Sequence, residues 1–113
     1  MSGSWMSVRL QCKCAALLVL LAFSASAQTP DAKRQAELVD LVREDCGSCH
    51  GTTLKGGLGR PLLPRQVGQY DTENLAAIIM NGVPGTPMPG WRGLLADEDA
   101  RWIAERLKKG LPE

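Results

Sequence analysis

Apolar residues recur with the period of an α-helix in three parts of the chain, and no run alternates for long enough to indicate a strand. The first part has Leu38, Leu41 and Val42 on one face, which is the spacing of a buried helix side. Just before it, Thr29-Pro30-Asp31 is typical of an N-cap, a proline at the first helical position and an acid near the positive end of the helix dipole. We predict a first helix that starts here and ends at about Asp45.

A second helix is predicted after Asp71, with Gly82 as its stop. Its apolar face is expected to contain Leu75, Ile78 and Ile79. A third helix is predicted to begin at Asp97 and to end at Lys108-Lys109-Gly110, where cations suit the negative end of the dipole. Its apolar stripe consists of Ala100, Ile103, Ala104 and Leu107.

The segments between these helices, 51–70 and 82–93, are rich in glycine and proline and are predicted to be loops. Long loops without secondary structure are uncommon in a compact domain. They are expected where they wrap a cofactor that stands in for part of the core. The pattern therefore predicts an all-α fold of three main helices and long loops around a bound group.

Residues 1–27 have the features of a secretory signal peptide. Arg9 and Lys13 precede an apolar run over 15–23, and small residues at 24–27 form a cleavage site. The apolar run is too short to span a bilayer, which takes about 20 residues. We expect cleavage after Ala27, export to the periplasm, no membrane anchor afterwards, and one domain over residues 28–113.

Eleven basic and twelve acidic side chains remain in 28–113, and this balance argues against nucleic acid as a partner. The remaining aromatic residues are Tyr70, Trp91 and Trp102, and Trp102, which lies off the apolar stripe of the third helix, is expected to pack. A domain this small and poor in aromatic residues needs further apolar mass or a covalent staple. A buried prosthetic group would supply that mass.

The strongest motif is Cys46-Gly47-Ser48-Cys49-His50. Two thiols at this spacing can each form a thioether with a haem vinyl group, and the adjacent imidazole can then bind the iron, as in c-type haem attachment. A disulfide remains chemically possible in an exported protein. A thioredoxin-like pair would need a βαβ setting, and a zinc site would need more ligands than one histidine and two cysteines provide. We favour one covalent haem c.

His50 is the only histidine of the chain, and its second ring nitrogen is expected to bond a backbone carbonyl of the segment 59–62, around Pro61. The second axial ligand is predicted to be Met88, which flanking prolines hold in a loop. Met80, in a helix beside apolar residues, is expected to pack in the core. His and Met ligation leaves no open iron position and suits electron transfer rather than enzymatic catalysis.

Other side chains of the two loops have two interpretations each. The basic residues either form a rim that attracts an acidic partner or a haem propionate, or are simply solvated. They are Lys55, Arg60, Arg65 and Arg92. Trp91 either donates its indole N–H to a propionate or packs.

The motif at 46–50, the downstream Gly59-Arg60-Pro61-Leu62 and the late methionine loop resemble class I cytochromes c over the whole of 28–113. More narrowly, 45–51, 54–59 and 85–91 are similar to the NirC group, small periplasmic cytochromes associated with haem-d nitrite reductase. The resemblance implies a fold whose first and last helices cross beside the haem. The chain departs from it at Leu38 and Val42, where many relatives have glycine and an aromatic residue, and at Arg106, where the last helix usually has an aromatic residue.

The resemblance implies a carrier of single electrons to or from nitrite reductase in denitrification, and we expect the chain to be a monomer. An alternative is an accessory role, in which the cytochrome accepts electrons during haem d synthesis. A third alternative, a ligand-binding or sensing haem protein, would require that Met88 does not bind the iron.

Overall fold

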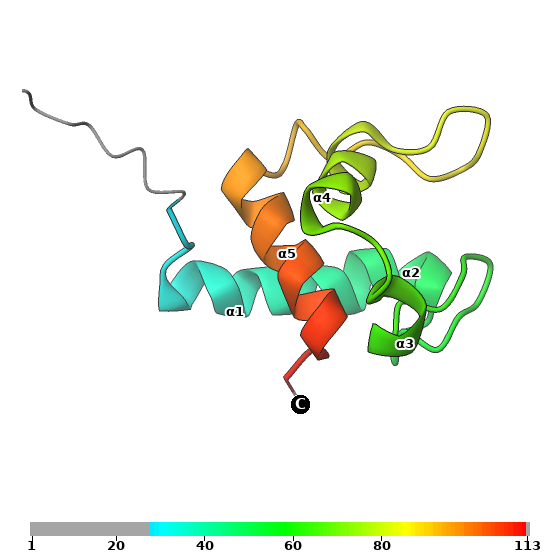
Figure 1. Cartoon of the computed structure of the whole chain (residues 1–113), viewed down its shortest axis with the longest axis horizontal. Coiled ribbons are helices and arrows are strands. Elements are labelled where there is room, and N and C mark those ends of the chain that lie inside the picture. Colours follow the sequence, from blue (N-terminus) through cyan, green and yellow to red (C-terminus); the bar gives the residue numbers. More distant parts are fainter. Residues whose placement is uncertain (1–27, 113) are drawn as a thin grey trace, which may run out of the picture.

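The computed structural model describes residues 28–112, and the predicted signal peptide lies outside them. Within this range the chain is helical and contains no strand, which confirms the all-α prediction. Three helical stretches dominate, as expected, and Figure 1 shows α5 crossing α1, with long loops on the side away from the N-terminal end of α1. None of the helices in 28–112 has the length and apolarity needed to cross a bilayer.

The first helix begins later than the sequence predicts. Helix α1 spans Ala32–Leu41, and its N-cap is Asp31 rather than Thr29, because the Asp31 carboxylate accepts the backbone N–H of Arg34 at 2.8 Å. Asp31 has extended backbone angles, so Pro30 precedes the helix instead of occupying its first position. The aspartate side chain thus satisfies a free N–H of the first turn.

The helical path also continues past Asp45, where we expected it to end. Helix α1 leads into a π-helical turn, η1, over Val42–Cys46, and this leads into a short α-helix, α2, over Gly47–His50. Gly51, at a φ of 85°, ends the path. Wider π-helical turns are often found at functional sites, and here the turn ends on the first cysteine of the motif.

Helix α4 spans Thr72–Asn81, with Asp71 as its N-cap and Gly82 as its C-cap, as predicted. Its buried face is rotated relative to the prediction. Leu75 is buried, but Ile78 is 38% exposed and lies on the flank of the helix. At 100° per residue, the side that packs in the core instead includes Ala76 and Met80.

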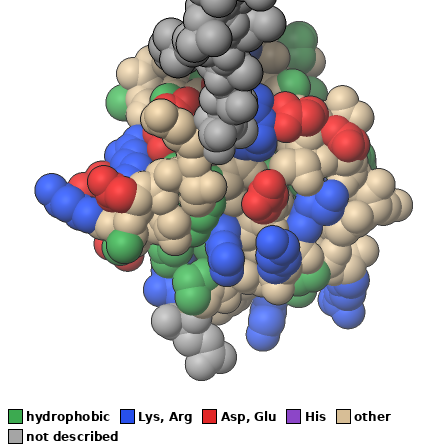
Figure 2. All heavy atoms as spheres, turned by 60° about the vertical axis from the view of Figure 1, so that its left-hand side comes forward, with side chains coloured by type: hydrophobic (Ala, Val, Ile, Leu, Met, Phe, Trp, Pro, Cys, Tyr) green, Lys and Arg blue, Asp and Glu red, His purple; other side chains and the backbone are tan. Residues whose placement is uncertain are grey.

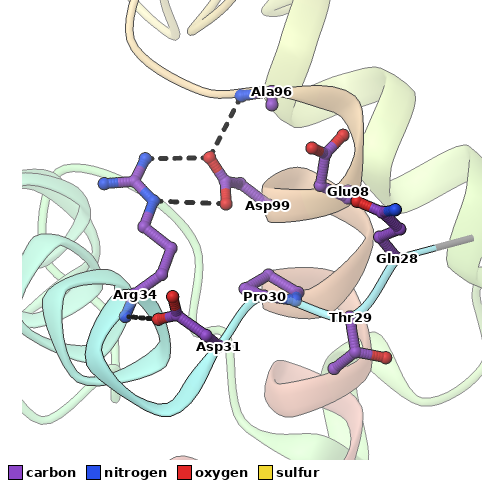
Figure 3. Close-up of a pocket in the computed structure, with 8 residues that line it drawn as sticks. All are labelled: Gln28, Thr29, Pro30, Asp31, Arg34, Ala96, Glu98 and Asp99. Atoms are coloured by element: carbon purple, nitrogen blue, oxygen red, sulfur yellow. Dashed lines mark hydrogen bonds and ion pairs between the residues drawn. The ribbon is translucent and has the colours of Figure 1, made fainter.

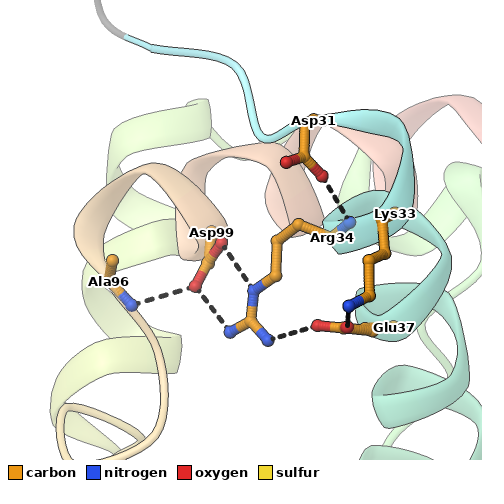
Figure 4. Close-up of polar contacts among 6 residues, drawn as sticks. All are labelled: Asp31, Lys33, Arg34, Glu37, Ala96 and Asp99. Atoms are coloured by element: carbon orange, nitrogen blue, oxygen red, sulfur yellow. Dashed lines mark hydrogen bonds and ion pairs between the residues drawn. The ribbon is translucent and has the colours of Figure 1, made fainter.

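Helix α5 spans Asp97–Lys109 and contains the predicted apolar stripe, all of it buried, together with Trp102. It contacts α1 through an ion pair between Arg34 and Asp99 (Figure 4). The two unusual positions of α1 and η1, Leu38 and Val42, are both fully buried. Arg106 lies over the ring of Trp102, 5.6 Å from its centroid, so this cation covers an aromatic face.

One short helix falls in a segment that we predicted to be loop. Helix α3 spans Pro64–Val67, with a proline at its start where the missing N–H costs no hydrogen bond. Val67 is buried, and α3 packs against α5. Because four residues give no complete apolar period, the sequence pattern could not reveal this turn.

Candidate functional site

The residues of the Cys-x-x-Cys-His motif lie on the helical path that follows α1. Cys46 is the last residue of η1, and Cys49 and His50 belong to α2. Both cysteines are free thiols; Cys49 is exposed, and Cys46 packs partly against the core. Burial, followed by the nearby charge of Asp45, raises the pKa of Cys46 to about 11. The two thiols of the motif are thus in unequal environments.

The imidazole of His50 is held by one short contact. Its Nδ1 lies 2.6 Å from the carbonyl oxygen of Arg60, inside the segment 59–62 that the sequence singled out and directly before Pro61. Because a carbonyl can only accept, Nδ1 is the protonated nitrogen. The other nitrogen, Nε2, therefore keeps its lone pair for a metal ion.

A glycine-rich turn packs against this imidazole and is hydrogen-bonded to the motif. Gly59 donates its N–H to the carbonyl of Cys49, and Gly56 donates to the carbonyl of His50, each at 2.8 Å. A Cβ atom added at Gly59 would lie 2.7 Å from Nδ1 of His50, so only glycine allows the ring this position. Sequence reasoning missed this role, although the repeated glycines after His50 were a signal.

Met88 lies in an ordered turn that folds back onto the end of α4. Its carbonyl accepts the N–H of Val83 at 3.2 Å, and its own N–H donates to Oγ1 of Thr86 at 3.3 Å. Met88 is half-buried, whereas Met80 is 5% exposed and confirms the prediction of core packing. In Figure 1 the loop that contains Met88 and the loop after His50 both project on the right-hand side of the helices.

The remaining candidate residues divide into anchored and exposed ones. Trp91 is half-buried, packs against the core, and donates its backbone N–H to carbonyls at the end of α4. Arg92 is engaged by Asn81 at 2.9 Å and Asp97 at 3.6 Å. The other three basic residues of the loops form no ion pair within residues 28–112 and are exposed. They are Lys55, Arg60 and Arg65.

Two surface pockets in the described part of the chain lie away from the motif. One lies between the segment before α1 and the start of α5, next to Arg34 and Asp99 (Figure 3). The other is lined by Arg43 and by residues of the segments 52–64 and 107–112, five of them leucines. Neither is lined by the motif or by Met88. No cluster of three or more His, Cys, Asp or Glu side chains that could hold a metal ion occurs within the described range.

The residues at the motif fit a haem c. Two free thiols at the sequence spacing of c-type haem attachment precede an imidazole whose tautomer leaves Nε2 free. The backbone of Gly59 packs directly against that ring. A thioether, the usual partner of histidine in electron-transfer cytochromes, lies in the other loop.

Comparison with known proteins gives the same assignment. Residues 33–105 match the family model for subunit III of cbb3-type cytochrome c oxidase. Cytochrome c55X of Paracoccus denitrificans is 58% identical over 95 residues, which cover 84% of this chain and 92% of that protein. The solved structure of the c-type cytochrome NirC has a TM-score of 0.70 and 50% identity, with 73% of this chain and 96% of that chain covered.

A second solved structure is that of a larger protein. The dihydro-heme d1 dehydrogenase NirN, in complex with DHE, matches with a TM-score of 0.59 and 32% identity over 66% of this chain. The match covers only 16% of the dehydrogenase, so it says nothing about the rest of that protein. The long matches are to cytochromes, which are electron-transfer proteins rather than enzymes. With its helical fold, its Cys-x-x-Cys-His motif and these relatives, the chain belongs to the c-type cytochrome family.

Proposed function

We propose that the chain carries one covalently attached haem, with thioether bonds to Cys46 and Cys49 and with His50 and Met88 as axial ligands. The observation that carries the proposal is the contact of His50 Nδ1 with the Arg60 carbonyl, which leaves Nε2 unprotonated and able to bind iron. When bound, the haem supplies a centre that gains and loses single electrons. The surrounding residues hold its ligands in place in both oxidation states.

Two rigid turns perform this holding. The turn at 56–59 fixes the imidazole through its hydrogen bonds to the carbonyls of Cys49 and His50. The turn at 83–88 fixes the backbone of Met88. Because both ligands come from ordered backbone, little reorganisation accompanies electron transfer. A closed iron site also excludes small ligands, which favours an electron carrier over a gas-binding protein.

Absorption spectra of the protein produced with periplasmic haem attachment test this proposal. The spectrum of the pyridine derivative should be that of a c-type haem, and acid acetone should not extract the haem from the protein. The oxidised protein should show the near-infrared band of methionine bound to ferric iron. Met88→Leu should lose this band, whereas the control Met80→Leu should keep it, because Met80 packs in the core. A band that survives in Met88→Leu, or carbon monoxide binding by the unchanged reduced protein, would contradict the ligand assignment.

We propose that the partner is a haem-d nitrite reductase of denitrification. The chain would act in the periplasm as a monomer, after removal of its signal peptide. Similarity to the c-type cytochrome NirC supports this pairing. Stopped-flow mixing of the reduced cytochrome with oxidised reductase should show one-electron exchange. Exchange no faster than with an unrelated haem protein of similar potential would remove nitrite reductase as the partner.

Similarity to a dihydro-heme d1 dehydrogenase favours a second candidate, in which the cytochrome accepts electrons during haem d synthesis. The two candidates differ in what deletion of the gene does. If the chain serves synthesis, the reductase made by the deletion strain should lack haem d. If it serves as the electron carrier, the reductase should contain haem d and respond normally to an artificial electron donor.

A further inference from the structure

Leu58 is the most exposed large apolar side chain among the described residues, at 95%, and it lies in the loop that holds the haem ligand His50. Single exposed leucines are common and need no explanation by themselves. This one differs because the residues on both sides of it, Gly57 and Gly59, have no side chains that could cover it. Its position is therefore a feature of the loop and not an accident of packing.

The backbone under Leu58 is fixed by hydrogen bonds to the haem-binding motif. Gly57 donates to the carbonyl of Gly59 at 3.0 Å, and Gly59 in turn donates to the carbonyl of Cys49 at 2.8 Å. An apolar side chain on such a rigid turn loses little backbone entropy when it is buried by a partner. It also brings that partner close to the attachment point of the cofactor.

Charge is segregated around this turn. The segment 46–70 contains three basic residues and no acidic one. The loop over 82–96 contains one basic residue and again no acidic one, whereas the rest of 28–113 has seven basic and twelve acidic residues. On the side that Figure 2 turns forward, which holds the start of α1, acidic and basic side chains lie beside one another. The charge of the molecule therefore orients the loop side toward an acidic surface.

We infer that Leu58, with Lys55 and Arg60, is the docking site for a redox partner whose surface has an apolar depression surrounded by acidic side chains. Both basic residues are exposed and form no ion pair with the rest of 28–112. They attract the partner over distance, and Leu58 fixes it at contact. A second copy of this chain fits poorly, since the same basic loops would face each other. This inference rests on the proposed electron-carrier function and names the surface through which that function operates.

The test measures the affinity and exchange rate of the haem-loaded protein with a purified haem-d nitrite reductase. Titration calorimetry at several salt concentrations gives the Kd, and stopped-flow absorption gives the exchange rate. Leu58→Ser should weaken binding about tenfold with little change in its salt dependence. Lys55→Glu should slow association about tenfold at low salt, and this difference should shrink at high salt.

Two matched controls make the same chemical changes elsewhere. Leu94 is 70% exposed but lies outside the docking loop, and Leu94→Ser should bind like the unchanged protein. The side chain of Lys33 is 88% exposed near the start of α1, and Lys33→Glu should leave the rate nearly unchanged. If each control behaves like its counterpart in the docking loop, the inference is wrong. Formation of dimers by this chain through Leu58, seen by sedimentation, would also overturn it.

A separate readout distinguishes this inference from the proposed pairing. Oxidation of the reduced cytochrome by anionic ferricyanide should be slowed by Lys55→Glu, and oxidation by a cationic cobalt(III) complex should be accelerated, with Lys33→Glu changing neither. If the unchanged protein exchanges no electrons with the reductase, the pairing fails and these small-ion rates decide the docking surface. If exchange is normal but Leu58→Ser and Lys55→Glu have no effect, the pairing stands and the docking surface is overturned.

Discussion

One buried carboxylate links the first and last helices, in addition to the apolar packing between them. Asp99 is 5% exposed and accepts Nη2 of Arg34 at 2.8 Å and Nε at 3.2 Å (Figure 4). It also accepts the backbone N–H of Ala96 at 3.1 Å, which caps the start of α5. Replacing Asp99 by alanine removes this ion pair between α1 and α5 and the cap of α5 at the same time.

The magnitude of this loss follows from these contacts. An N-cap or equivalent side-chain cap contributes about 1 kcal/mol. The two charged hydrogen bonds to Arg34 would be worth more in a dry interior, but about a third of the Arg34 side chain is exposed, so water partly replaces them and about 1–2 kcal/mol is reasonable. We therefore expect Asp99→Ala to lower the free energy of unfolding by about 2–3 kcal/mol. Asp99→Asn keeps an oxygen for the cap and should lose less.

The same carboxylate should make stability depend on pH in acid. The hydrogen bond from Arg34 holds the pKa of Asp99 below its usual value, against the opposing effect of burial, and the N–H of Ala96 adds to the lowering. A carboxyl group with a lowered folded-state pKa contributes its full stability above the unfolded-state value of about 3.9. That contribution disappears as the pH falls through the folded-state pKa. The difference between the unchanged protein and Asp99→Asn should therefore shrink below about pH 4.

Guanidinium unfolding of the haem-loaded protein, followed by circular dichroism of the helices at neutral and acid pH, measures both effects. The control is Arg101→Gln, which removes an exposed ion pair with Glu73 at 2.6 Å and should leave the midpoint close to that of the unchanged protein. The reasoning is refuted if Asp99→Ala unfolds at the midpoint of the control. A stability difference between the unchanged protein and Asp99→Asn that is the same at pH 3 and pH 7 would refute the electrostatic part.

Three further substitutions or reactions test other parts of the structure. Gly59→Ala places a methyl group against the His50 ring and should lower the yield of haem-loaded protein and alter its absorption spectrum, whereas Gly93→Ala, in open space, should not. In haem-free protein at about pH 8, iodoacetamide should modify exposed Cys49 before Cys46, because a pKa of about 11 keeps Cys46 a neutral thiol. Peptide mass spectrometry measures the order of modification, and the reverse order would contradict this prediction. Leu38→Ala, at a fully buried position, should cost about 2–5 kcal/mol in guanidinium unfolding, and an equal cost for exposed Leu94→Ala would show that the burial is wrongly assigned.

The sequence predicted the parts of the fold that have a full helical period. Helix α4 and helix α5 begin and end as expected, because Asp71, Asp97, Gly82 and Gly110 are strong boundary residues. The start of α1 was misplaced by two residues, since Thr29 and Asp31 are both good caps and only the hydrogen bond to Arg34 distinguishes them. The π-helical turn at Val42–Cys46 could not be predicted, because one extra residue per turn leaves no separate apolar pattern.

At the site, the sequence identified side chains but not the backbone that positions them. The motif and the lone histidine indicated the haem site, and the segment 59–62 was expected to supply the hydrogen-bond acceptor of His50. The structure specifies the Arg60 carbonyl and adds the close packing of Gly59 on the ring. Such contacts depend on where two segments of the loop approach each other, and the propensities of single residues do not contain that information.

The distribution of contacts in the molecule divides stability from function. Near the N-terminal ends of α1 and α5, side-chain contacts stabilise the fold: Arg34 pairs with Asp99, and fully buried Leu38 adds apolar packing. Around the motif, backbone groups hold the structure in place. Glycine N–H groups donate to the carbonyls of Cys49 and His50, and the Arg60 carbonyl orients the imidazole. Side chains on the motif loops, such as Leu58 and Lys55, therefore do not stabilise the fold. They can change with the partner while the helices and the proposed haem ligands stay unchanged. Substitutions at Asp99 and at Leu58 should therefore affect unfolding and docking independently.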